Sequence, residues 1–95
     1  MPTEILAVGT TLDSSADVPV DAGSELVVFL KDETGGLVAS TARVNILLKD
    51  DDGAYFFAGS LIGSDPEKTS AVLAGGATYR FTRPAGVGSC GVASG

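Results

Sequence analysis

Six clusters of turn-forming residues divide this chain of 95 residues, and that division constrains the fold more than any other feature. Glycine adopts backbone conformations that other residues avoid, proline fixes its own φ, and Asp side chains bond to nearby backbone groups, so such clusters mark turns. The segments between them are the size of β-strands. The clusters lie at 21–23, 33–36, 50–53, 63–66, 75–76 and 84–86.

Most of the intervening segments are rich in β-branched and aromatic residues, which favour strands. Short strands with regular turn signals predict an all-β fold: a compact β-sandwich or jelly-roll-like domain, or a small barrel, of about 7–8 short antiparallel strands. Folding would bury roughly 63% of the surface of a chain this small, which suffices for one core, so residues 1–95 are expected to form a single domain. The expected strands are 4–8, 17–20, 24–32, 41–50, 54–62, 69–74, 77–83 and 87–93.

For two segments, a helix is an alternative to a strand. Leu37, Thr41, Val44 and Leu48 recur at helical spacing within 36–50, although the β-branched residues there fit a pleated sheet better. Near 66–74, one short helix is a stronger alternative, because Asp65 could cap it, Pro66 could occupy its first position and two glycines could end it.

The turn at 50–53 permits two hairpin registers. A two-residue turn at Asp52 and Gly53 places Leu48 opposite Phe57. A three-residue loop from Asp51 to Gly53, with Gly53 in the left-handed conformation, places Leu48 opposite Phe56 and Leu47 opposite Phe57. In both registers, Phe56 and Phe57 point to opposite faces of the sheet.

Several strands carry apolar residues on both faces, whereas a two-layer sandwich needs only one apolar face per strand. In 24–32, Val27 and Phe29 lie opposite the face of Leu26, Val28 and Leu30, and in 43–49 the second face still offers Leu47. Scattered exposed apolar residues are common on protein surfaces, so this pattern alone does not require a partner. Burial against another subunit would also explain it. The candidate interface residues are Phe29, Leu47, Phe56 and Phe57.

Charge narrows the range of partners. The chain has 12 Asp and Glu against 6 Lys and Arg, a net charge of −6. Nucleic-acid binding needs clustered positive charge, and anionic membranes repel an acidic protein, so neither partner is expected. The first four residues lack the basic start of a signal peptide, and no apolar run approaches the roughly 20 residues of a membrane span.

The side chains that usually perform catalysis are scarce. There is no His, so a Ser, Thr or Cys90 nucleophile lacks its commonest base, and Cys90 is interpreted as a small buried residue of the last strand. The run Asp50 to Asp52 does not match an EF-hand, because the acids are contiguous and no Glu stands at the twelfth position, so it is interpreted as a solvated hairpin tip. No catalytic residue, metal or cofactor is therefore predicted, and the chain is not expected to be an enzyme.

Four segments resemble small structural proteins of tailed-bacteriophage virions: ILAVGTT (5–11), SSADVPVDAGS (14–24), LKDDDGAY (48–55) and LAGGATYRFTRP (73–84). The resemblance covers most of the chain as a pattern, without a diagnostic motif. It implies a β-sandwich, commonly trimeric, that decorates or cements the head by binding the major capsid protein. The expected location is then the capsid surface of the virion, after synthesis in the cytoplasm of the bacterial host.

Two other functions remain as alternatives. The same resemblance also covers phage tail or fibre components, although the chain lacks an obvious receptor-binding or long fibre segment. A carbohydrate-binding sandwich would present exposed aromatic rings, often Trp, for stacking on sugars. This chain has no Trp and only two tyrosines.

Overall fold

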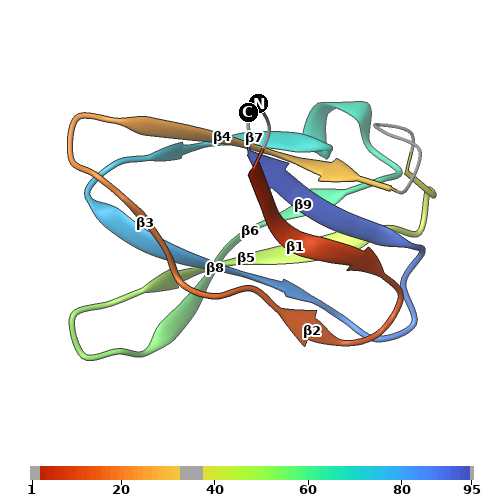
Figure 1. The fold of residues 1–95 in the computed structure, drawn as a ribbon, viewed down its shortest axis with the longest axis horizontal. Helices are drawn as coiled ribbons and strands as arrows, with labels where there is room; N and C mark the ends of the chain where they lie inside the picture. The colour runs from red at the N-terminus through yellow and green to blue at the C-terminus, as the bar shows by residue number, and fades with distance from the viewer. Residues whose placement is uncertain (1–2, 33–37, 95) are drawn as a thin grey trace.

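Two antiparallel sheets pack face to face in the computed structural model, which describes residues 3–32 and 38–94 (Figure 1). The first sheet has the strand order β1–β9–β4–β7 and the second has β2–β8–β5–β6, with β3 also paired to β8. The predicted all-β sandwich is confirmed. The strands are β1 (Thr3–Gly9), β2 (Asp13–Ser14), β3 (Val18–Val20), β4 (Glu25–Lys31), β5 (Arg43–Lys49), β6 (Tyr55–Ile62), β7 (Ser70–Ala74), β8 (Ala77–Arg83) and β9 (Cys90–Ser94).

The core lies between the two sheets and follows the two-residue periodicity of strands. On β4, Val28 and Leu30 point inward and are buried, whereas Val27 points outward. The central strand β8 contributes Phe81, which is fully buried. The remaining buried apolar side chains come from both sheets and include Leu6, Val44, Ile46, Leu61, Leu73, Tyr79, Cys90 and Val92.

The helical alternatives are resolved in favour of strands. The part of 36–50 that is regular forms β5, as expected from its β-branched residues. Near 66–74, only one 3₁₀ turn forms, η1 (Pro66–Lys68), whose first turn is capped by the Asp65 carboxylate accepting a hydrogen bond from the Glu67 N–H at 3.0 Å. The alternative of a helix reaching 74 is wrong, because the residues from Ser70 onward form β7 and pair with β4, in agreement with the strand expected at 69–74. The turn expected at 33–36 lies outside the described residues.

The hairpin between β5 and β6 adopts the three-residue loop. Leu48 lies opposite Phe56 and Leu47 opposite Phe57, so the register with a two-residue turn is wrong. Gly53 has φ of 86°, a conformation that favours glycine. Farther along, Ile46 pairs with Gly59, so Ala58 is an extra residue that forms a β-bulge in β6.

Arg83 is an unusual component of the interior, since only 2% of its surface is exposed. Its Nη1 donates hydrogen bonds to the carbonyl oxygens of Ala7 and Cys90, and its Nε donates to that of Thr11, each at 2.7 Å. Gly9 leaves room for the guanidinium, because a Cβ there would lie 2.9 Å from Nη2. Arg83 therefore links β8 of the second sheet to β1 and β9 of the first.

We expect Arg83→Met to destabilise the fold by about 3 kcal/mol or more, because it removes three hydrogen bonds between the sheets, one of them to the buried Cys90 carbonyl. Urea unfolding at neutral pH measures the loss. Arg43→Met is the matched control: Arg43 is exposed on the same sheet, and its replacement should change stability by less than about 1 kcal/mol. Equal losses for the two variants would contradict the role assigned to Arg83.

Candidate functional site

The outer face of the second sheet carries one exposed apolar pair. Phe57 on β6 lies directly opposite Leu47 on β5, and 65% of the Phe57 surface is exposed. Leu47 is partly buried. These two side chains, called the Phe57 patch below, project from the middle of two paired strands and not from a loop, so their positions are fixed by the sheet.

Phe56 points to the other side of β6, toward the interior, yet 56% of its surface is exposed. Its partner Leu48 lines a groove of about 430 Å³ that opens between the two sheets, with β6 on one side and β7 on the other. Ile46, Leu73 and Tyr79 line its floor. Phe56 is therefore an inward-facing residue near the open side of the sandwich, not part of the outer surface.

A second apolar patch lies on the outer face of the first sheet. Val27 on β4 is paired directly with Val72 on β7, and they are 44% and 61% exposed. Phe29 is two residues further along β4 on the same face and is partly buried. These three side chains, called the Val72 patch below, lie on the opposite side of the sandwich from the Phe57 patch, because they belong to the outer face of the other layer.

The four candidate interface residues therefore do not form one surface. The structure brings together Leu47 and Phe57, places Phe56 beside the groove, and places Phe29 on the far face. Val72 was not among the candidates. Val72 is exposed because Leu73 faces inward, so Val72 faces outward, and because β7 is an edge strand. The sequence of 69–74 does not show that this strand lies at an edge.

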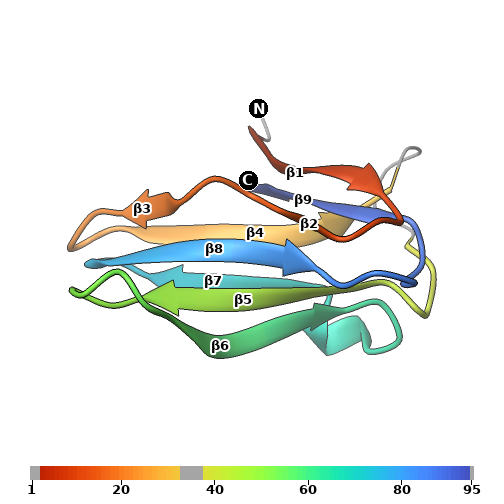
Figure 2. The same ribbon diagram turned by 90° about the horizontal axis from the view of Figure 1, so that it is seen from below.

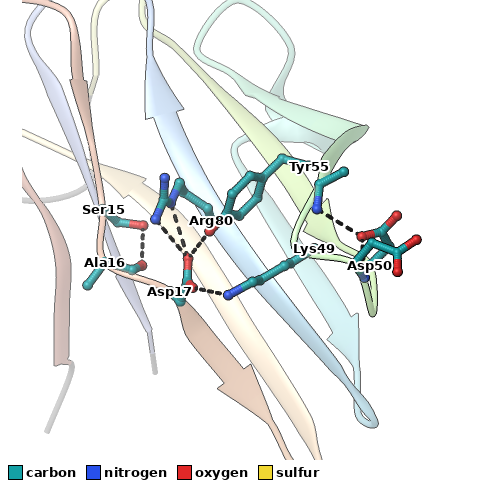
Figure 3. Close-up of polar contacts among 9 residues, drawn as sticks. Ser15, Ala16, Asp17, Lys49, Asp50, Tyr55 and Arg80 are labelled. Carbon is teal, nitrogen blue, oxygen red and sulfur yellow. Dashed lines mark hydrogen bonds and ion pairs between the residues drawn. The ribbon is translucent and has the colours of Figure 1, made fainter.

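The outer face of the second sheet also holds a polar cluster of Asp17, Lys49, Tyr55 and Arg80, called the Asp17 cluster (Figure 3). Asp17 Oδ1 accepts hydrogen bonds from the Tyr55 hydroxyl at 2.7 Å and from Arg80 Nε at 3.2 Å. Asp17 Oδ2 accepts one from Lys49 Nζ at 3.0 Å. The Arg80 guanidinium also lies 4.4 Å from the centre of the Tyr55 ring, within the range of a cation–π contact.

The local chain path explains how Asp17 reaches this face. Ser15 is buried, and its N–H donates to the Phe81 carbonyl at 2.8 Å, while its hydroxyl accepts from the Phe81 N–H at 3.0 Å. This pairing fixes the segment between β2 and β3 along β8. Arg80 points away from the buried Tyr79 and Phe81, because successive side chains of a strand point to opposite faces.

The cluster shifts the titration of its members. Hydrogen bonds from Tyr55 and then Lys49 lower the pKa of Asp17, because they stabilise its ionised form. The same hydrogen bonds to Asp17 raise the pKa values of Lys49 and Tyr55. A carboxylate held ionised in this way is a weak base, so the cluster is suited to tying the 13–17 segment to the sheet rather than to proton transfer.

The acidic hairpin tip is a turn with its own internal cap. Asp50 Oδ1 accepts hydrogen bonds from the N–H groups of Asp52 at 2.9 Å and Ala54 at 2.8 Å. Asp51 and Asp52 are exposed. Within residues 3–32 and 38–94, no group of three or more His, Cys, Asp or Glu side chains is arranged to hold a metal ion.

Cys90 occupies the position that was predicted for it. It is fully buried at the start of β9, and its thiol donates to the Arg43 carbonyl oxygen at 3.9 Å. Burial raises the pKa of this thiol. Cys90 is therefore a packing residue of the core, since a reactive thiol needs a lowered pKa and access to solvent.

Comparison of the chain with protein-family models, with curated proteins and with solved structures finds no match. In the described part of the chain, no helix has the length and apolar character needed to cross a membrane.

We expect the free energy of unfolding of the Asp17→Asn variant to depend less on pH below about pH 6 than that of the wild type. A lowered folded-state pKa means that the Asp17 carboxylate stabilises the fold above its ordinary pKa of 3.8, and that this contribution disappears as the pH falls through the lower folded value. Urea midpoints measured from about pH 6 to about pH 2 should therefore fall more steeply for the wild type than for the variant. Asp51→Asn, at the exposed tip, should keep the wild-type slope. Parallel profiles for wild type and Asp17→Asn would contradict this account.

Proposed function

We propose that this chain is a non-enzymatic structural protein of a tailed bacteriophage, which decorates the head by binding the major capsid protein as a homo-oligomer. The observation that carries the proposal is the pair of apolar patches on opposite faces of one sandwich. A cement protein stabilises a shell by holding neighbouring subunits together, so each copy needs at least two contact surfaces. The Phe57 patch and the Val72 patch supply two.

The size of the chain is sufficient for this role. A standard specific interface buries about 800 Å² per partner. The folded chain exposes 5346 Å², so one such contact would cover roughly 15% of its surface. Two contacts on opposite faces therefore fit without overlap.

The contact side chains are also held in place before binding. Val27, Val72, Leu47 and Phe57 all stand on paired strands, so little backbone freedom is lost when a partner covers them. The net charge of −6 favours a capsid surface with some positive charge. For the carbohydrate-binding alternative, the contact between Tyr55 and Arg80 is unfavourable, because the guanidinium covers a ring face that a sugar would need.

Cryo-electron microscopy of particles of the phage whose genome encodes this chain tests the proposal. We expect density for the sandwich at repeating lattice positions on the outside of the head. Density confined to the tail would favour the tail or fibre alternative and overturn the head assignment. Absence from the particle, together with binding of the purified protein on a glycan array, would favour the carbohydrate-binding alternative.

The Val72 patch gives a mutational test on purified heads lacking the chain. We expect Val72→Asp to weaken binding at least tenfold, because a desolvated carboxylate at the centre of an apolar contact costs more than about 1.4 kcal/mol. Ala85→Asp adds the same charge at an exposed turn outside both patches and should bind like the wild type. The melting temperatures of both variants serve as the folding control. Equal binding by Val72→Asp and wild type would exclude this patch as the head contact.

A further inference from the structure

The edge strand β6 has no strand paired with its outer edge and is unusually apolar, although η1 contacts it. Among the described residues it pairs with β5 alone, and it forms the lower edge of the second sheet in Figure 2. Its eight residues, YFFAGSLI, include no charge and no proline, and two exposed phenylalanines stand near one end. Proteins usually protect such edges with charged residues or proline. Here only the bulge at Ala58 interrupts the edge.

The pairing with β5 identifies which backbone groups face outward. Asp50 N–H donates to the Ala54 carbonyl at one end of the hairpin, and Gly63 N–H donates to the Ala42 carbonyl at the other, both at 2.9 Å. Hydrogen-bonded and non-hydrogen-bonded pairs alternate along antiparallel strands. Counting inward from these two hydrogen bonds, on either side of the bulge, therefore shows which residues of β6 bond to β5 and which do not. The N–H and C=O groups of four residues point away from β5: Tyr55, Phe57, Ser60 and Ile62.

We propose that β6 pairs in antiparallel orientation with β6 of a second copy of this chain. In the one register that uses the whole edge, Phe57 faces Ser60 of the second copy, Tyr55 faces its Ile62, and the two bulges meet at the two-fold axis. The facing residues are all uncharged, so no like charges are brought together across the new pair. The ring of Phe57 then lies beside Ser60 and Ile62 of the second copy, on the same face of the joined sheet.

Charges beyond the two ends of β6 favour a second copy as the occupant. Arg43 is exposed beside Ile62, and within the described residues it has no ion pair, only hydrogen bonds to Asn45 and Ser60. The exposed acids Asp51 and Asp52 lie beyond the opposite end of the strand. Antiparallel pairing brings the acidic tip of each copy toward Arg43 of the other, once on each side of the axis. The turn that follows Ile62 also carries Asp65, Glu67 and Lys68, so the charge argument rests on the unpaired Arg43 and the acidic tip, while in hydrogen bonding the edge is complementary to itself.

This inference does not rest on the proposed function, because it concerns the purified chain alone. It differs from what the resemblance to virion proteins implies, since pairing about a two-fold axis produces a dimer and not a trimer.

Sedimentation equilibrium of the purified chain tests the proposal, with Ser60→Pro and Ser60→Ala as a matched pair. Both variants remove the Ser60 hydroxyl, which bonds to Arg43 and Asn45, but only proline also removes the outward N–H. We expect the wild type and Ser60→Ala to form dimers at micromolar concentration, and Ser60→Pro to dissociate at least tenfold more readily. A wild type that is monomeric at 100 times that concentration, or trimeric, would overturn the proposal, as would equal dimerisation of the two variants.

Hydrogen exchange locates the contact without any substitution. The amides of Phe57 and Ser60 should exchange slowly at high protein concentration and rapidly at low concentration. The amide of Val72, on the other uncovered edge β7, should exchange at the same rate at both concentrations. A dimer in which Val72 is protected and Phe57 is not would show that β7, and not β6, makes the contact.

A charge exchange between exposed positions avoids any effect on folding. One variant carries Arg43→Glu, and the other carries Asp51→Lys together with Asp52→Lys. Each alone places like charges near one another in the proposed dimer and should dimerise at least fivefold more weakly than wild type. Mixed together, they restore opposite charges on both sides of the axis and should form heterodimers of near wild-type affinity. Ala7→Glu adds a negative charge at an exposed position of β1 in the first sheet and should dimerise like the wild type. Equal weakening by Ala7→Glu and Arg43→Glu would show that net charge alone causes the effect.

Discussion

The buried guanidinium of Arg83 is the interaction on which the closure of this sandwich depends. It extends from β8 in the second sheet and donates to carbonyl oxygens of β1, of β9 and of the turn after β1. A chain with one cysteine has no disulfide within itself to join its two layers, and a core this small leaves little stability in reserve. The hydrogen bond to the Cys90 carbonyl is buried and the two to Ala7 and Thr11 are partly buried, so removing Arg83 affects both layers at once.

Much of the fold could be predicted because the turns are specified by local chemistry. The clusters of Gly, Asp and Pro separated the strands, and the β-branched residues of 43–49 decided against a helix there. The hairpin register was not decided, because Asp51, Asp52 and Gly53 suit either loop. Gly59 is typical of a bulge, but it does not say which residue of the strand is the extra one. The short strand β2 was missed for a related reason: two residues are too few to show a period. The alternation of β8 does place Arg83 on the same inward face as Tyr79 and Phe81. Alternation alone cannot say whether the last inward-facing residue of a strand is buried.

The candidate surface was harder to predict than the fold, since it depends on which strands lie at the edges. Phe56 and Phe57 were expected on opposite faces, and the structure places only Phe57 with Leu47. Phe56 is on the inward side of β6 and is still exposed, and its partner Leu48 lines the open groove between β6 and β7. In the Asp17 cluster, Asp17 lies 32 to 63 positions from its partners in sequence, so no spacing rule could assemble it. Its only sequence signal was the outward direction of Arg80.

The proposed edge pairing changes what the two patches can do. Paired side chains in an antiparallel ladder point to the same face, so the two-fold axis of a β6 dimer runs perpendicular to the sheet. Both Val72 patches then lie on one side of the dimer and both Phe57 patches on the other. A head contact through the first sheet would be made twice by each dimer, and the second contact would form at a high effective concentration. A chain with room for only modest contacts on each face could in this way bind a repeating lattice far more tightly than one copy would.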